Sequence, residues 1–123
     1  MKLRIKGNTL RLRLTKSELE YFEKSNFIEE KTAFGSSIFS YSLCAENIDT
    51  LTATLENNKI IVHMPFPMAK EWTETQIVGF NSEMEIGDNK KLFILVEKDF
   101  KCLDETIEDQ SDNYENPLAS SHP

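Results

Sequence analysis

The chain has 123 residues, of which 39% are hydrophobic and 28% charged, and both fractions are typical of an ordinary globular protein. Fourteen Lys and Arg against 21 Asp and Glu leave a net charge of −7, which argues against a dedicated nucleic-acid-binding protein. The longest apolar run, residues 92–96, is too short to span a bilayer, and no apolar signal segment opens the chain. The two cysteines, Cys44 and Cys102, match no metal motif, so we expect reduced thiols in a cytoplasmic protein.

Residues 2–6 and 9–13 alternate between apolar and basic side chains, and Gly7-Asn8 between them suits a two-residue hairpin turn. In that register Ile5 opposes Leu10 and Leu3 opposes Leu12, whereas a shift by one residue would lose both pairs. The other face of the predicted hairpin then carries five cations: Lys2, Arg4, Lys6, Arg11 and Arg13.

A helix is predicted next, because Thr15 and Glu18 have the spacing of a capping box and Leu14 and Leu19 that of a hydrophobic staple. Phe22 would lie on its buried side. Residues 27–34 and 38–44 then indicate two strands joined around Gly35-Ser36.

The second half has the same plan. Strands are predicted over 50–56 and 59–64 around Asn57-Asn58, then a short helix over 68–75 that carries Trp72. A last hairpin is predicted over 76–86 and 91–98, with its turn at residues 87–90. Residues 92–96 are apolar on both faces, which favours a central strand covered on both sides.

The two halves superpose at an offset of 50 residues without a gap, from Ile5 on Leu55 through Phe22 on Trp72 to Phe27 on Ile77. We therefore predict an α+β fold in which a duplicated ββαββ unit forms a strongly curved antiparallel sheet or closed barrel of about eight strands with two short helices. The predicted core consists of Leu3, Ile5, Leu10, Leu12, Phe22, Leu55, Ile60, Val62, Trp72, Phe93 and Leu95.

The composition changes near residue 104. Residues 104–123 contain six Asp and Glu and no Lys or Arg, so we expect one domain over 1–103 and a partly disordered acidic tail over 104–123. About 20 residues of flexible chain have a root-mean-square span of roughly 25 Å, which is enough for this tail to reach the basic hairpin.

The five cations of the hairpin are the first candidate site. Arg4 would face Arg11 and Lys2 would face Arg13, and like charges across a ladder are destabilising. Either the protein's own carboxylates and solvent offset this repulsion, or Arg side chains hold a phosphate or carboxylate ligand. Expected partners are a small anion or an acidic protein segment, which could be the chain's own tail, and neither nucleic acid nor a membrane is expected.

The carboxylates of the last hairpin are the second candidate. Glu83 and Glu85 would project from one side of a strand, with Glu97 on its partner, and such a group could hold a divalent cation. The alternative is a solvated strand face. His63 could join Cys44 and Cys102 at a metal, but no pair has zinc-like spacing, which favours a structural histidine.

The opening residues 1–18, together with residues 72–79, 95–103 and 116–117, resemble a family of short bacterial proteins, mostly from Bacteroidetes, with the opening K-[IL]-R-I-K-G-N. The resemblance covers nearly the whole chain. It implies no known activity and therefore assigns no functional residue.

A weaker architectural likeness is to the triphosphate-tunnel phosphohydrolases, which bind polyphosphate and a divalent metal inside a closed barrel. Their opening Glu-x-Glu-x-Lys is matched here by Lys2-Leu3-Arg4-Ile5-Lys6, so only Glu83, Glu85 and Glu97 could supply metal ligands. The leading hypothesis is thus a binding or interaction module without catalysis or cofactor, and the alternative is a metal-dependent phosphohydrolase acting on a small polyphosphate. A cationic face inside a barrel would favour the enzyme, and one on an open surface would favour the module.

Overall fold

The structure, a computed structural model, describes residues 1–100, so the predicted tail 104–123 and Cys102 lie outside the described residues. Within this part the elements are β1 Lys2–Lys6, β2 Thr9–Leu14, α1 Lys16–Ser25, β3 Phe27–Ala33, β4 Ile38–Glu46, β5 Thr52–Glu56, β6 Lys59–Pro65, α2 Phe66–Glu74, β7 Gly79–Gly87 and β8 Lys90–Lys98. These strands and helices confirm the α+β class.

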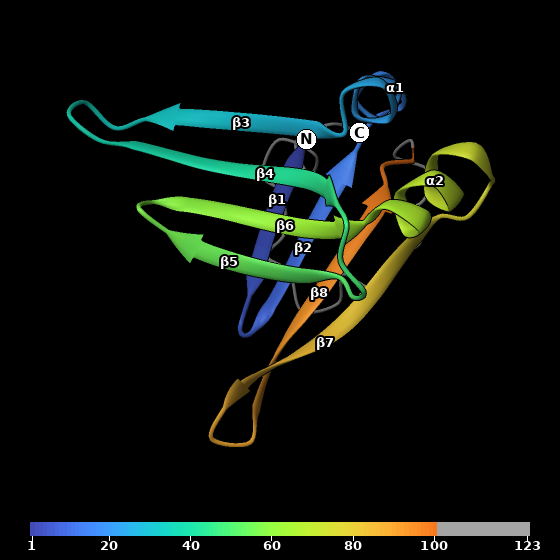
Figure 1. Cartoon of the computed structure of the whole chain (residues 1–123). Helices are drawn as coiled ribbons and strands as arrows, with labels where there is room; N and C mark the ends of the chain where they lie inside the picture. The colour runs from blue at the N-terminus through green and yellow to red at the C-terminus, as the bar shows by residue number, and fades with distance from the viewer. Residues whose placement is uncertain (101–123) are drawn as a thin grey trace, which may run out of the picture.

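The described strands form two four-stranded sheets, seen one behind the other with obliquely crossing strands in Figure 1. The first sheet has the order β1-β2-β8-β7 and the second the order β3-β4-β6-β5. Both central pairings, β2 with β8 and β4 with β6, are parallel, while the outer pairings are antiparallel. The expected single antiparallel sheet or closed barrel is therefore not confirmed. Each hairpin pairs through its inner strand with a hairpin from the other half of the chain, which leaves β1, β7, β3 and β5 as sheet edges.

The hairpin registers follow from local sequence. Ile5 opposes Leu10 and Leu3 opposes Leu12, as predicted. The second predicted hairpin has Leu55 opposite Ile60. Its turn residues Asn57 and Asn58 have φ values of 50° and 63°, which Asn tolerates better than most residues.

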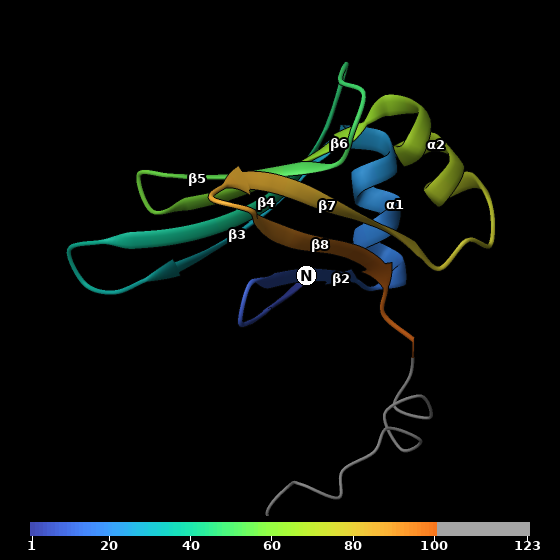
Figure 2. The same cartoon turned by 90° about the horizontal axis from the view of Figure 1, so that it is seen from below.

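The two helices lie side by side at one end of the sheets (Figures 1 and 2). The predicted capping box is present in α1, where Thr15 Oγ1 accepts from the Glu18 N–H and Glu18 Oε1 accepts from the Thr15 N–H at 2.8 Å. Phe22 of α1 meets Trp72 of α2 edge to face, with ring centroids 6.1 Å apart. These two rings, both fully buried, join the halves of the molecule.

One hydrophobic core fills the space between the sheets, and four residues of the predicted core lie outside it: Ile5, Leu55, Phe93 and Leu95. Ile5, Leu55 and Phe93 are 58%, 69% and 41% exposed, whereas Ile94 and Val96 are fully buried. The parallel pairing places Ile94 beside Leu10 and thereby turns Phe93 and Leu95 outward. β8 is thus central in its sheet but covered on one face only.

The element order repeats as ββαββ. β5 starts at residue 52 and β1 at residue 2, which gives the predicted offset of 50, but β7 starts at 79 and β3 at 27, which gives 52. The ungapped match of Phe27 to Ile77 is therefore wrong. The chain between α2 and β7 is longer, and the Trp72 indole N–H donates to the Val78 carbonyl there at 2.9 Å. The first residue of β7, Gly79, has to be a glycine, because a Cβ at this position would lie only 2.1 Å from the Val96 carbonyl oxygen.

Candidate functional site

The five cations of the first hairpin lie on the outer side of the first sheet. Leu10, Leu12 and Leu14 of β2 are buried between the sheets, so the alternating residues of β1 and β2 face outward. We call this surface the cationic face: Lys2, Arg4, Lys6, Arg11 and Arg13. It belongs to an open four-stranded sheet, and its side chains are exposed or half-buried.

Carboxylates near the end of β8 pair with three of these cations. Lys2 Nζ lies 3.1 Å from Asp99 Oδ2, and Glu97 Oε1 lies 3.1 Å from Arg11 Nε and 3.7 Å from Arg13 Nε. Among residues 1–100, no carboxylate lies within salt-bridge distance of Arg4 or Lys6, although Arg4 is the cross-strand partner of Arg11. The face therefore has an uncompensated part around Arg4 and Lys6.

A shallow hollow occupies this uncompensated part. Arg4, Lys6, Thr9 and Arg11 line it, and its volume is about 190 Å³. Thr9 is the ladder partner of Phe93, whose outward ring is partly exposed, so an apolar strip borders the hollow on β8. Three basic side chains and a hydroxyl thus converge where an anion of phosphate size could bind.

The equivalent hairpin of the second sheet has no such surface. Its inward residues Ile60, Val62 and Met64 are buried like Leu10, Leu12 and Leu14. At the offset of 50, the outward residues that match the cationic face and Thr9 are Thr52, Thr54, Glu56, Ile61, His63 and Lys59. Because this hairpin folds in the same register without the basic residues, the fold itself does not require them.

The structure does not bring the three candidate metal ligands together. Glu97 lies opposite Gly79 and pairs with Arg11 and Arg13, while Glu83 lies opposite Phe93 and pairs with Lys91 at 3.2 Å. Glu85 is exposed near the end of β7. Within residues 1–100, no three His, Cys, Asp or Glu side chains form a group that could hold a metal ion.

His63 is engaged at both ring nitrogens on the outer side of the second sheet. Its Nδ1 pairs with Glu46, and its Nε2 lies 3.0 Å from Thr54 Oγ1. Cys44 is its ladder neighbour, and burial, with the charge of Glu46, raises the pKa of the Cys44 thiol. These contacts support the structural histidine. The sequence reasoning missed Glu46 and Thr54 because their contact with His63 depends on how three strands line up.

The sequence also gave no signal for a cluster around the first residue. The Met1 ammonium group pairs with Glu18 and with Glu30, the latter at 3.2 Å, and the Tyr41 hydroxyl donates to the Met1 carbonyl at 2.9 Å. Burial would raise the pKa of Glu18, but hydrogen bonds from the Met1 ammonium and Thr15 outweigh it and lower that pKa. Burial and the carboxylates Glu30 and Glu18 raise the pKa of Tyr41. This cluster attaches the start of β1 to α1 and the second sheet.

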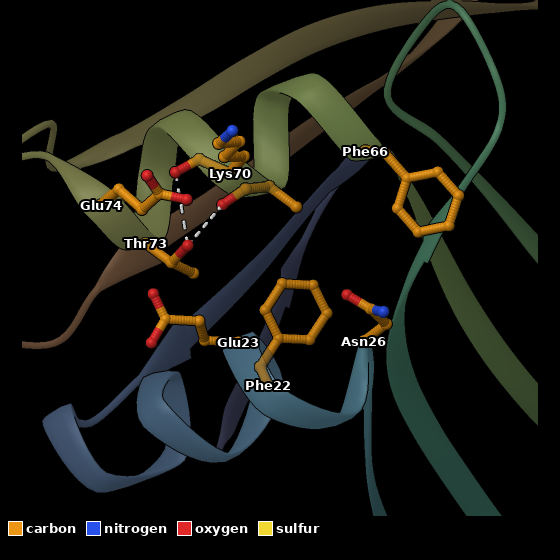
Figure 3. A pocket seen from close by; sticks show the side chains of 8 residues that line it. Phe22, Glu23, Asn26, Phe66, Lys70, Thr73 and Glu74 are labelled. Carbon is orange, nitrogen blue, oxygen red and sulfur yellow. Dashed lines mark hydrogen bonds between the residues drawn. The ribbon is translucent and has the colours of Figure 1, made fainter.

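Two further hollows arise from the packing of distant segments. One, of about 270 Å³, lies between the helices, where Figure 3 shows Glu23 of α1 and Glu74 of α2 on either side of Thr73. The other, of about 320 Å³, lies between the sheets, where it is lined by Ile5, Leu55 and other uncharged residues. Neither gathers three side chains of one charge. A third hollow, of about 450 Å³, is lined by Glu18, Glu29 and Glu30, but these carboxylates pair with the Met1 ammonium group and Lys31. The cationic face, where Arg4 and Lys6 have no carboxylate partner among residues 1–100, is therefore the best candidate site.

A family model for a family of unknown function, DUF7009, matches residues 1–118. The chain belongs to this family. No curated protein and no solved structure matches the chain. In the part of the chain that the structure describes, neither helix is long and apolar enough to cross a membrane. Membership of DUF7009 assigns no activity, so function has to be argued from the cationic face.

Proposed function

We propose that this protein is a small binding module, without catalysis, that holds a multivalent anion on the cationic face. The same proposal places it in the bacterial cytoplasm, in keeping with the resemblance of its opening residues and with its few cysteines. The anion class is a phosphate or polyphosphate group, or a cluster of carboxylates, because the Arg guanidinium group forms bidentate hydrogen bonds with phosphates and with carboxylates.

The observation that carries the proposal is the difference between two equivalent hairpins. The β5–β6 hairpin has the same register and buries apolar side chains at the equivalent positions, but it has Thr54 where the first hairpin has Arg4, and Ile61 where the first has Arg11. Cross-strand repulsion makes an Arg4–Arg11 pair unfavourable for the free protein. A bound anion between these side chains would offset that repulsion.

The position of the hollow gives further support. The uncompensated Arg4 and Lys6 line it together with Arg11, on an open sheet surface that small anions and acidic chain segments can both reach. An open surface favours a binding module over a tunnel enzyme, whose substrate would be enclosed by a barrel.

The test is a calorimetric titration with tripolyphosphate at low salt. Arg4→Thr and Arg11→Ile exchange each residue for its counterpart in the β5–β6 hairpin. Each should weaken binding by roughly 10- to 100-fold, because hydrogen bonds to charged groups contribute about 1.5–3 kcal/mol.

Lys59→Thr is the matched control, because it makes the reverse exchange at the position equivalent to Thr9 and removes one positive charge away from the face. Equal losses for all three variants would show a general charge effect and would contradict the proposal. The phosphohydrolase alternative predicts phosphate release from tripolyphosphate when Mg²⁺ or Mn²⁺ is added, and the binding module predicts none.

A further inference from the structure

The described part of the chain ends beside the cationic face. After β8, the Asp99 N–H donates to the Leu14 carbonyl at 2.8 Å, and the Asp99 carboxylate pairs with Lys2 at 3.1 Å. The described structure therefore ends next to the row formed by Lys2 and Arg13. Arg4 and Lys6 lie farther along the same strand, on the same face.

The following segment has the complementary charge. Residues 104–115 contain six carboxylates and no Lys or Arg: Asp104, Glu105, Glu108, Asp109, Asp112 and Glu115. The cationic face holds five basic side chains within β1 and β2. Two segments of one small chain thus carry opposite charges, and the described structure ends beside the cationic face, four residues before the acidic segment starts in the sequence.

Two carboxylates at the end of the described structure already pair with three of the five cations of the cationic face. Glu97 pairs with Arg11 and Arg13, and Asp99 pairs with Lys2. These two acids come just before the acidic segment in sequence. The uncompensated cations, Arg4 and Lys6, are the next ones along the face, where further carboxylates of the same chain would arrive.

The distances allow this contact. Four residues of extended chain, from 100 to 104, span at most about 14 Å. The four residues from Lys2 to Lys6 along β1 span about 13 Å. The acidic segment can therefore reach the hollow without any change in the described structure.

We propose that residues 104–115 dock on the cationic face over Arg4 and Lys6 and compete there with the bound anion. This inference rests on the proposed anion-binding function and names an internal competitor that regulates the same site. Exposed ion pairs are individually weak and are screened by salt, so the segment exchanges rapidly and a compact multivalent anion displaces it. The attachment in one chain keeps its local concentration high.

The first test maps the contact directly by zero-length carbodiimide cross-linking of the full chain. Carboxylates of residues 104–115 should cross-link to Lys2 and Lys6, and tripolyphosphate or high salt should suppress these products. Lys31 and Lys59, which lie on the second sheet, are the internal controls. In a mixture of ¹⁵N-labelled and unlabelled chains, cross-links within one chain support the proposal, and cross-links only between chains overturn it.

The second test measures tripolyphosphate affinity in a full-length variant whose six carboxylates are replaced by amides: Asp104→Asn, Glu105→Gln, Glu108→Gln, Asp109→Asn, Asp112→Asn and Glu115→Gln. Binding should tighten about 3- to 10-fold at low salt, and the difference should shrink as salt rises, because the competing ion pairs are screened.

A control variant changes six exposed carboxylates elsewhere and has the same net charge: Glu20→Gln, Glu23→Gln, Asp49→Asn, Glu56→Gln, Glu71→Gln and Glu74→Gln. If both variants tighten binding equally, the effect is one of net charge and docking is overturned. If none of the proteins binds tripolyphosphate, the proposed function fails, while cross-linking still decides whether the segment docks.

Discussion

The β1–β2 and β5–β6 hairpins have the same register and bury apolar side chains at equivalent positions, but their outer surfaces differ. Leu12 and Val62 are both fully buried at equivalent positions, because both strands line one core between the sheets. On the outside, five cations of the first hairpin stand where the second has threonines, one isoleucine, one histidine and one glutamate. Folding constrains the inner positions alike, so the outer positions of each hairpin are open to function.

The largest expected effect is at the contact where the two halves meet. Trp72→Ala and Phe22→Ala should each lower the free energy of unfolding by about 3–5 kcal/mol, because each removes a fully buried ring. Urea unfolding followed by circular dichroism measures this, since Trp72 is the sole tryptophan and its loss removes the fluorescence probe. Phe34→Ala, at a 69% exposed position, is the control and should change stability by less than about 0.5 kcal/mol. Comparable costs for all three would contradict the claim that burial of the two rings stabilises the fold, and clearly unequal costs for Phe22→Ala and Trp72→Ala would contradict the equivalence of the two rings.

A second prediction distinguishes the two helices. α1 begins with the Thr15–Glu18 capping box, while α2 follows Pro65 without a side-chain cap. Folding lowers the pKa of Glu18 below its ordinary value of 4.5. The Glu18 carboxylate therefore contributes its full share of folding stability above pH 4.5, and this share is lost as the pH falls through the lower pKa of Glu18 in the folded protein. Glu18→Gln should therefore destabilise by about 1 kcal/mol at neutral pH and by less in acid.

Urea titrations of wild type and Glu18→Gln at neutral and acidic pH give this difference directly. Met68→Gln, at the equivalent position of α2, is the matched control, and its effect on stability should not depend on pH. A pH-independent difference between wild type and Glu18→Gln would show that the Glu18 charge does not stabilise the fold.

The smallest expected effect is on stability at the cationic face. Arg4→Thr should raise the free energy of unfolding by about 0.2–1 kcal/mol at low salt, because it removes the like-charged partner of Arg11. The gain should shrink at high salt. Thermal unfolding at two salt concentrations measures it, and a clear loss of stability would mean that Arg4 serves the fold rather than a ligand.

Local sequence was sufficient for features that depend on neighbouring residues. The Gly7-Asn8 and Asn57-Asn58 turns set the hairpin registers, and the capping box set the start of α1. The cationic face followed from the alternation of residues 2–13, because side chains of a strand alternate between its two sides. The last hairpin was also predicted, apart from the start of β7.

The tertiary structure decided how the hairpins combine. No local pattern indicates that β2 pairs in parallel with β8 rather than closing a barrel, since this pairing joins residues more than 80 positions apart. It decided that Ile94 and Val96 are buried and Phe93 is exposed, because an apolar run such as 92–96 fits either face of a strand. It also separated Glu97 from Glu83 and left Arg4 and Lys6 without a described carboxylate partner, because such contacts depend on the order of strands within a sheet.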